Sequence, residues 1–388
     1  MCDKNIGGGP GVSPTRTQGP TPLVIVEGFL GGAGPLLWGN FGSHCDSDCQ
    51  SDAGKPRRKV IFVSIGPVSS LHDRACELYY ALKGGTVDYG AAHARANGHA
   101  RYGRHHHVGL YPEWSFEKPL HFIGHSVASI FSPVTSHMLL IIRFHQGGPT
   151  ITKLQWLLDI GFFGRSETPN MVLSLTAISS PFRGTQVVYT LGERTDQAPR
   201  VRPFSIGSLL TKGVHIASYL SPYMPTFLDM HADARSMSYM TTSFRKFVMS
   251  LRQSDWGESR DAAPFDVTFE AADLREANFE GLPHPQTYYR SYAAQMVRTA
   301  KTNADTAIHG HHKPSIRYAL LNLPLFALSS IMGSYNFSAI KPSPSVVACH
   351  NSYNDFYRSR WHDCGDQAIR ANDGIVPIFS QWHPFNCS

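Results

Sequence analysis

The chain has 388 residues, which is long for one domain and short for three. Hydrophobic residues make up 42% of it, enough for a large core, and 34 Gly with 26 Pro indicate many turns. The formal charge of +6 is spread along the chain without a run of Lys and Arg. This distribution argues against a protein that binds DNA or RNA.

The beginning of the chain and its cysteines say little about the compartment. Residues 1–20 are rich in Gly, Pro, Thr and Ser, and we expect a disordered tail without the apolar stretch of a secretory signal. No run of roughly 18 apolar residues predicts a membrane span. The 7 cysteines do not make a disulfide framework in a chain of this length. Cys45 and Cys49 could pair or bind metal, but the spacing is more typical of free or singly paired thiols.

Five short apolar runs predict buried strands, and stretches with helical periodicity separate several of them. Such an alternation is typical of an α/β fold with a mostly parallel central sheet covered on both faces. The sequence contains no internal repeat. The predicted strands are 23–26, 60–65, 120–123, 171–178 and 287–294.

One amphipathic stretch lies outside this alternation. Residues 204–220, bounded by Pro203 and Pro222, carry apolar residues at helical spacing. A flap over an apolar site and an ordinary core helix both have this pattern. The pattern alone favours the core helix.

A candidate nucleophile follows the third predicted strand. His121–Ser126 predicts a strand that runs into Gly-His-Ser. In α/β-hydrolases the nucleophile lies on a sharp strand-to-helix turn, which needs small residues two positions before and two positions after it. Gly124 meets the first requirement, whereas Ala128 meets the second less well. A Ser two residues after a Gly is common by chance, so this match alone is weak evidence for Ser126.

Two backbone N–H groups are candidates for an oxyanion hole. One lies just after the first strand, at Phe29, and the other follows the nucleophile, at Val127. Glycines at 28, 31, 32 and 34 fit an exposed loop there. The alternative is an ordinary glycine-rich turn.

A candidate carboxylate lies late in the chain, in Asn372-Asp373-Gly374. A carboxylate in such a turn can orient the histidine that acts as general base, in the chain order Ser, Asp, His. Asp-Gly is also the commonest kind of turn, so Asp373 carries weight only together with the other motifs.

Several blocks together resemble the zinc-containing thermoalkalophilic bacterial lipases and their fungal relatives, from about Leu23 to Phe379. The most specific blocks are residues 73–77, 84–93 and 98–101. The remaining blocks are 66–70, 180–181, 184–185, 287–289 and 372–376. The resemblance implies an α/β-hydrolase fold and carboxylic ester hydrolysis, with triacylglycerols as the principal substrates.

The resemblance also implies one structural zinc ion in an insertion at about 71–110. Its ligands would be two aspartates and two histidines, which suit zinc and close its coordination shell. Without the resemblance, scattered His and Asp would be interpreted as solvated surface residues. The run 105–107 is interpreted as exposed. The four implied ligands are Asp73, His93, His99 and Asp261.

A helical lid over the acyl-chain groove is the third implied feature, at about 200–255. The amphipathic stretch 204–220 falls in this region, which now favours the flap over the core helix. A flap of this kind would expose its apolar face only on a lipid–water interface.

The sequence departs from the family at the nucleophile. The family motif is Gly-His-Ser-x-Gly-Gly, but here residues 127–146 separate Ser126 from Gly147-Gly148. The stretch 151–158 predicts the helix that should follow the nucleophile directly. We interpret the insertion as translated intron sequence, because this turn is the most constrained in the fold. A genuine lineage-specific insertion is the alternative.

A second departure concerns the general base. The family's catalytic histidine lies some tens of residues beyond the Asp-Gly turn, whereas this sequence ends at Ser388. Its sole histidine after Asp373 is His383, in a segment unlike the family's. We treat the general base as missing, and no calcium site can be assigned. Glu27 replaces a histidine of the bacterial members, which leaves the backbone donor intact.

Taken together, these features predict a lipase-type ester hydrolase of which this sequence is an inactive form. Two alternatives remain open. One is a non-catalytic lipid- or partner-binding protein that kept the fold. The other is a hydrolase of phospholipids or thioesters.

Overall fold

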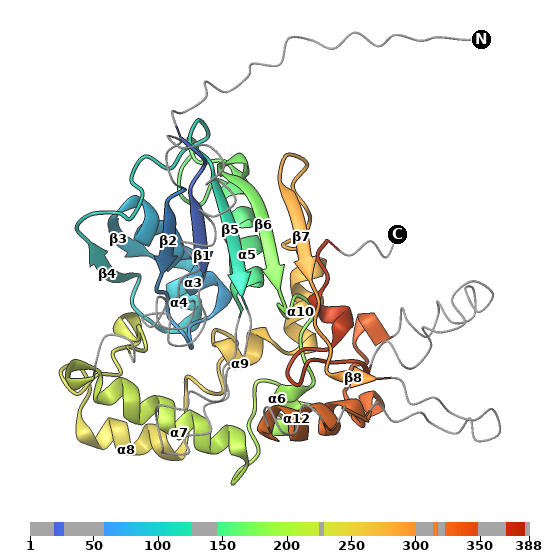
Figure 1. The fold of residues 1–388 in the computed structure, drawn as a ribbon. Helices are drawn as coiled ribbons and strands as arrows, with labels where there is room; N and C mark the ends of the chain where they lie inside the picture. Colours follow the sequence, from blue (N-terminus) through green and yellow to red (C-terminus); the bar gives the residue numbers. More distant parts are fainter. Residues whose placement is uncertain are drawn as a thin grey trace, which may run out of the picture.

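A five-stranded sheet forms the centre of the molecule, with strand order β2-β1-β5-β6-β7 and every neighbouring pair parallel. This computed structural model describes residues 19–26, 58–125, 146–224, 229–298, 313–314, 316, 323–347 and 370–384. The strands are β1 (Leu23–Val26), β2 (Val60–Val63), β5 (Leu120–His125), β6 (Val172–Ile178) and β7 (Tyr288–Tyr292). Their carboxyl ends all lie at the lower edge of the sheet in Figure 1.

All five strands predicted from the apolar runs are confirmed, and the sheet is parallel as expected. Burial explains why the runs were recognisable: all four residues of β1 are buried, because β1 lies between β2 and β5. β1 matches its predicted run, β5 continues beyond it to His125, and the other three strands are shorter than their runs by one or two residues at an end. The fold is that of an α/β-hydrolase.

Two helices pack side by side against the sheet and close the main core. They are α3 (Leu71–Lys83) and α5 (Gly147–Asp159). Ser70 caps α3 by accepting a hydrogen bond from the N–H of Asp73, and Lys83 lies at the carboxyl end of the helix dipole. Their buried residues join the strands in one hydrophobic cluster that includes Trp114 and Phe122. The helix predicted at 151–158 is therefore confirmed as part of α5.

A small antiparallel unit lies beside the β2 edge of the sheet (Figure 1). It consists of β3 (Gly85–Asp88), α4 (Ala91–Asn97) and β4 (Tyr102–His106), and β3 pairs with β4. It corresponds to the insertion expected at about 71–110. Helix α3 itself belongs to the main core, so the part that projects begins only at Gly84.

Below the carboxyl ends of the strands lie two helices in contact, α7 (Ile206–Tyr219) and α8 (Phe244–Arg252) (Figure 1). The Tyr219 and Phe247 rings stack with centroids 4.1 Å apart and join the two helices. Short turns connect them, η3 (Ser221–Tyr223) and η5 (Asp233–Arg235). We call residues 200–255 the lid region. It contains the helix expected at 204–220.

A second hydrophobic cluster surrounds the turn at 372–377. None of the described helices is long and apolar enough to cross a membrane. The elements of the cluster are α6 (Val187–Leu191), α10 (Phe269–Ala277), α12 (Leu323–Gly333), η6 (Phe337–Ala339) and η7 (Ile378–Gln381). The remaining elements are η2 (Pro169–Met171), α9 (Ala263–Asp266), β8 (Val297–Arg298) and β9 (Lys313–Pro314).

Candidate metal centre and hydrolase site

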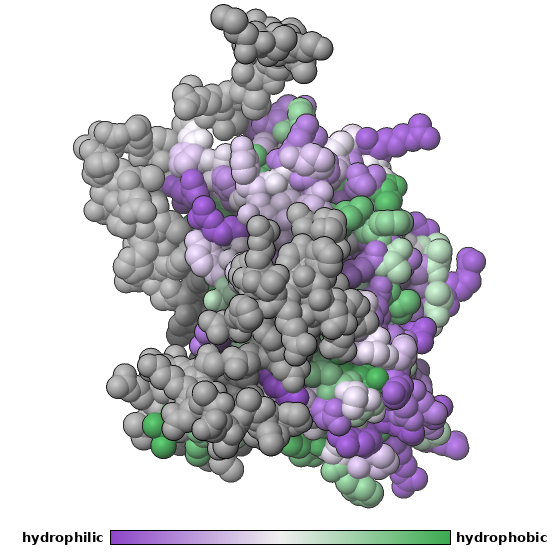
Figure 2. All heavy atoms as spheres, turned by 90° about the vertical axis from the view of Figure 1, so that its right-hand side faces the viewer, coloured by the Kyte–Doolittle hydropathy of each residue, from purple (hydrophilic) through white to green (hydrophobic). Residues whose placement is uncertain are grey.

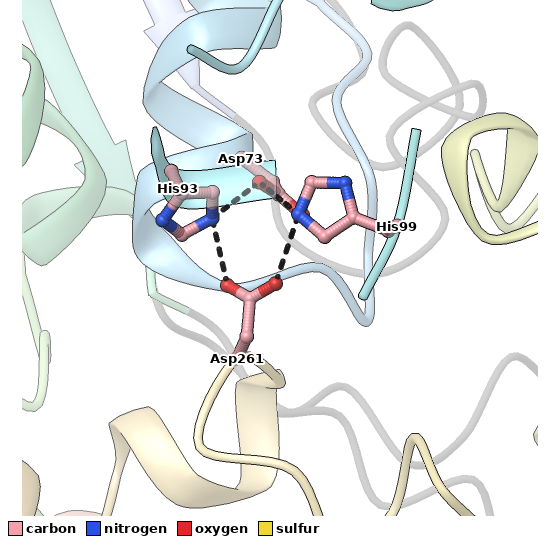
Figure 3. A group of neighbouring side chains, drawn as sticks. All are labelled: Asp73, His93, His99 and Asp261. Carbon is pink, nitrogen blue, oxygen red and sulfur yellow. Dashed lines mark hydrogen bonds and ion pairs between the residues drawn. The ribbon is translucent and has the colours of Figure 1, made fainter. Parts of the chain in front are cut away.

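The four residues expected to bind metal converge in the structure (Figure 3). Asp73 lies in the first turn of α3, His93 on α4, His99 just after α4, and Asp261 just before α9. Each offers one ligand atom, and these atoms all lie within 4.8 Å of one another. Residues nearly 190 positions apart in the sequence thus meet around one point.

The distances between these atoms fit a tetrahedral ion. His93 Nε2 lies 3.2 Å from Asp73 Oδ1 and 3.2 Å from Asp261 Oδ1. His99 Nε2 lies 3.3 Å from Asp261 Oδ2 and 3.9 Å from Asp73 Oδ1. Metal–ligand bonds of zinc give a tetrahedron with edges of about 3.3 Å. The spacing therefore suits zinc.

The histidine tautomer also fits a metal ligand. His99 Nδ1 is 2.8 Å from the carbonyl oxygen of Ala100, so this nitrogen carries the proton and donates it. Nε2 of His99 is therefore a free lone pair, and it is buried without a hydrogen bond. A cation between the four side chains would bind to this nitrogen. Without a cation, its nearest partners are Asp261 Oδ2 at 3.3 Å and Asp73 Oδ1 at 3.9 Å.

Burial and mutual charge perturb the group as a whole. Burial raises the pKa of Asp73. Burial also disfavours the ionised form of Asp261, but its close contacts with the His93 and His99 rings, together with the charge of Arg235, outweigh burial and hold the pKa of Asp261 well below its usual value. The two carboxylates likewise overcome burial at His93 and raise its pKa to about 9. The site thus attracts positive charge strongly.

Two glycines set the loop that presents the histidines. Gly90 precedes α4 with φ at +86°, and a Cβ there would lie 2.9 Å from the Phe162 ring. Gly98 ends α4 in the left-handed conformation, which turns the chain so that His99 points back toward His93. These glycines belong to the blocks that resemble the lipase family, and their conformations explain the requirement for glycine.

At the hydrolase site, strand β5 ends where helix α5 begins. A Cβ built on Gly124 would lie 2.3 Å from the backbone nitrogen of Gly148, and one built on Gly147 would lie 2.7 Å from that of His125. The strand and helix are therefore in direct backbone contact, as in a tight strand-to-helix turn. Ser126, Val127 and Phe29 lie outside the described residues.

Gln146 lies at the start of α5. Its side chain is buried and donates a hydrogen bond of 2.8 Å to the carbonyl of Ala263. Its own carbonyl accepts a hydrogen bond from the N–H of Thr150 in the first turn of α5. The insertion expected at 127–146 stays a prediction, because residues 127–145 lie outside the described part of the chain.

Residues 19–315 match the family described as "Lipase-like, C-terminal domain". The chain belongs to this family. It is 29% identical over 286 residues to a lipase of Staphylococcus hyicus, covering 72% of this chain and 41% of that protein. It is 25% identical over 387 residues to Lipase 1 of Staphylococcus aureus (strain Mu50 / ATCC 700699), covering 94% and 46%. The chain thus spans less than half the length of these relatives.

Solved structures show the same fold. The crystal structure of Staphylococcus hyicus lipase superposes with a TM-score of 0.64 and 24% identity, covering 96% of this chain and 83% of that one. EstA from Clostridium botulinum gives a TM-score of 0.59 and 25% identity, with 95% and 76% covered. The central sheet and its helices are therefore those of the lipase-like family.

In this lipase-like chain, Asp373 occupies the turn expected for a carboxylate. Its Oδ1 accepts hydrogen bonds from the N–H groups of Ile375, at 2.9 Å, and Val376, at 2.7 Å. Gly374 adopts φ of +102°, which closes the turn. Burial raises the pKa of Asp373 to about 6, although these N–H groups and the Ser179 hydroxyl oppose the rise.

His383 lies against β7. Its ring stacks on Phe182 with centroids 4.6 Å apart, and its backbone N–H donates a hydrogen bond to the Ser291 hydroxyl of β7. Burial lowers its pKa to about 4. No hydrogen bond or ion pair joins His383 to Asp373 within the part of the chain that the structure describes. The absence of a general base from this chain stays a prediction.

Two residues of these sites were not identified from the sequence. Gln146 was missed because the insertion hides its place in the motif. Arg235 was missed because nothing in the sequence around it points to the metal centre. Its guanidinium donates hydrogen bonds to the carboxylate and to the carbonyl of Asp261, the latter at 2.5 Å.

Proposed function

We propose that this protein derives from a lipase that hydrolyses carboxylic esters, with triacylglycerols as its principal substrates. The direct contact between Gly124 at the end of β5 and Gly148 at the start of α5 carries this proposal. Ser180, after β6, donates to the carbonyl of Gly124 at 3.2 Å, and its neighbour Ser179 bonds to Asp373. The turn for the nucleophile and the carboxylate thus meet at one edge of the sheet.

In the active form, Ser126 would attack the ester carbonyl, and Asp373 would orient the histidine that takes the serine proton. The N–H groups of Phe29 and of the residue after Ser126 would stabilise the oxyanion. That second residue is Val127 in this sequence. It is Gln146 in a chain from which residues 127–145 are removed, and the motif then becomes Gly-His-Ser-Gln-Gly-Gly.

The chain with residues 127–145 in place is inactive in this proposal. Gln146, Gly147 and Gly148 occupy the start of α5 as a tight turn requires, but 19 residues separate them in sequence from Ser126. The N–H group at the helix start therefore does not follow the nucleophile. His383, stacked on Phe182, does not supply the base.

The metal centre has a structural role in the same proposal. Asp73, His93, His99 and Asp261 would hold one zinc ion, and four protein ligands leave no position for substrate. A zinc ion there would supply a cross-link between α3, α4 and the segment before α9. The ligands would act by joining the insertion to the main core.

The lid region would bind a lipid–water interface. Leu209 of α7 is 70% exposed, and Phe244 and Met249 of α8 are 68% and 62% exposed. Figure 1 places α7 and α8 at the lower end of the molecule, and Figure 2 shows hydrophobic side chains at the lower edge of the face that it presents. Neither α7 nor α8 contains an acidic residue, and together they carry Lys212, Arg245, Lys246 and Arg252.

The interrupted motif also favours a second candidate, a non-catalytic protein that binds lipid or a partner through the same fold. Hydrolysis of phospholipids or thioesters is a third candidate, because the same triad can hydrolyse triacylglycerols, phospholipids and thioesters. Sequencing of the transcript separates the first two. Spliced reads that join Ser126 to the codons around Gln146 support the enzyme, whereas transcripts that always retain codons 127–145 support the non-catalytic protein.

A further inference from the structure

Arg235 lies against the metal centre without being one of its ligands. Its Nη2 donates hydrogen bonds to Oδ2 of Asp261 and, at 2.5 Å, to the backbone carbonyl of the same residue. The same nitrogen is 3.7 Å from Oδ2 of Asp73. One cationic group thus faces one oxygen of each carboxylate in the centre.

The Oδ1 atoms of both carboxylates face His93, and Oδ2 of Asp261 also lies 3.3 Å from Nε2 of His99. Oδ1 of Asp73 and Oδ1 of Asp261 each lie 3.2 Å from Nε2 of His93. The two Oδ2 atoms are the ones that Arg235 contacts. A carboxylate whose second oxygen is occupied by a guanidinium can offer only one oxygen to a metal.

The position of Arg235 is fixed by contacts outside the centre. Arg104 of β4 binds Asp229 at 3.0 Å and Asp233 at 2.6 Å. The N–H of Ala100, next to His99, donates to the carbonyl of Ala234 at 2.9 Å. The turn that carries Arg235 is therefore held to the same insertion that provides the histidines.

We propose that Arg235 is a positioning residue that makes the metal centre four-coordinate and selects zinc over calcium. Calcium requires six to eight oxygen ligands and commonly uses both oxygens of a carboxylate. Zinc accepts two nitrogens and two single oxygens in a tetrahedron. Arg235 hydrogen-bonds Oδ2 of Asp261 and pairs at 3.7 Å with Oδ2 of Asp73, which favours single-oxygen ligation by both aspartates over the ligation that calcium requires. This inference rests on the metal centre of the proposed function.

Cobalt(II) provides the test, because four-coordinate cobalt absorbs visible light far more strongly than five- or six-coordinate cobalt. The full chain is stripped of metal, loaded with one equivalent of cobalt, and compared with Arg235→Met and Arg235→Lys. We expect the wild type to show the intense band and both variants to lose at least half of it. Lysine keeps the charge, but its shorter side chain and compact ammonium group do not reproduce the two hydrogen bonds that Nη2 of Arg235 makes to Asp261.

Competition between zinc and calcium is the second readout. We expect the preference for zinc over calcium to fall by roughly 10- to 100-fold in Arg235→Met, the range typical of residues that orient metal ligands. Arg101→Met is the matched control, because Arg101 of the same insertion pairs with Asp88 at 2.7 Å and touches neither Arg235 nor a ligand side chain. It should keep the wild-type cobalt band and the wild-type zinc preference.

The outcomes separate the two proposals. An Arg235→Met protein with the cobalt band and zinc preference of the wild type overturns the role of Arg235. Loss of the band in Arg101→Met to the same extent also overturns it, since the effect would then not be specific to Arg235. If the wild type itself binds neither cobalt nor zinc at one ion per chain, the metal site of the proposed function is wrong. If Arg235→Met does not fold, Arg235→Lys decides by the same criteria.

Discussion

The metal centre and the hydrolase site differ in how their residues reach one another. The four metal ligands come from four separate segments, yet short hydrogen-bonded elements and glycine-dependent turns bring them within 4.8 Å. The hydrolase site depends on a single strand-to-helix turn. That turn is interrupted in sequence, although β5 and α5 still meet in space.

This difference shows that the fold and its activity depend on different residues. A site assembled from distant segments requires only that each segment folds, whereas the nucleophile turn requires covalent continuity at one point. Packing can hold Gln146 at the start of α5, but Gln146 still does not directly follow Ser126 in the sequence. The metal centre is therefore expected to work in this chain, and the hydrolase site is not.

The largest expected effect is on catalysis. The chain with 127–145 in place should show no serine-dependent hydrolysis of soluble or emulsified esters. Deleting residues 127–145 and adding a histidine-bearing C-terminal segment of the family type should restore activity by a factor on the order of 10⁴ or more. Titrimetric assays with a triacylglycerol emulsion measure it.

Ser126→Ala in the repaired protein is the control and should abolish the gain. Either repair alone should recover little, because the members of a triad act as a unit. Robust hydrolysis by the unrepaired chain that disappears in Ser126→Ala would show that the interruption does not matter. The comparison between the two sites would then be wrong.

Metal removal should have the next largest effect, and on stability rather than chemistry. We expect about one zinc per chain, and chelation should lower the melting temperature by roughly 5–10 °C, because a ligand bound at 100 to 1,000 times its Kd stabilises the fold by about 3–4 kcal/mol. His93→Ala should reproduce this loss, whereas His107→Ala, an exposed histidine outside the group, should not. An unchanged melting temperature after chelation would show that no metal ion stabilises the fold at these four residues.

A smaller effect is expected at the lid region. The double variant Arg245→Glu/Lys246→Glu should bind vesicles of anionic phospholipid at least tenfold more weakly, because each basic residue near such a surface contributes about 1 kcal/mol. Sedimentation with vesicles at low and high salt measures this. Arg95→Glu/Arg165→Glu makes the same charge change at exposed positions elsewhere and should leave binding nearly unchanged. Equal losses in both double variants would mean that net charge alone governs binding.

The smallest effect concerns Glu193, which is buried at the base of the lid region. Burial raises its pKa to about 8, so the folded state holds a proton that the unfolded state loses near its ordinary pKa. The stabilisation is complete below that ordinary pKa and is lost as the pH rises through 8. Glu193→Gln should flatten this fall of the unfolding free energy between pH 5 and 8 in denaturation curves. An identical pH profile in the variant would exclude Glu193 as its source.

The sequence allowed most of the fold to be predicted because its strands are short, apolar and buried. Buried parallel strands such as β1 have few polar residues, so their positions are visible as runs. Helix α5 was predicted correctly although an insertion precedes it, since its apolar spacing does not depend on what comes before. The burial of Gln146 could not be predicted, because it depends on a contact with Ala263, 117 positions away.

The sites show the same limit. Asp73, His93, His99 and Asp261 were predicted only through the resemblance, since their spacing in sequence follows no local metal motif. Arg235 could not be predicted, because its contact with Asp261 arises from the path of the chain in three dimensions. The roles of Ser126, Phe29 and Val127 remain predictions, since these residues lie outside the described part of the chain.

The contact between β5 and α5 holds together the two parts of the chain on either side of residues 127–145. Strand β5 is paired with β6, and helix α5 packs against α3, so elements before and after residues 127–145 hold one another across the sheet. Their association does not require the peptide link between them. The molecule is therefore divisible at this place: a fragment that ends after His125 and a fragment that begins at Gln146 share an interface built from main-core residues. Co-expressed, they should reassemble as a noncovalent pair.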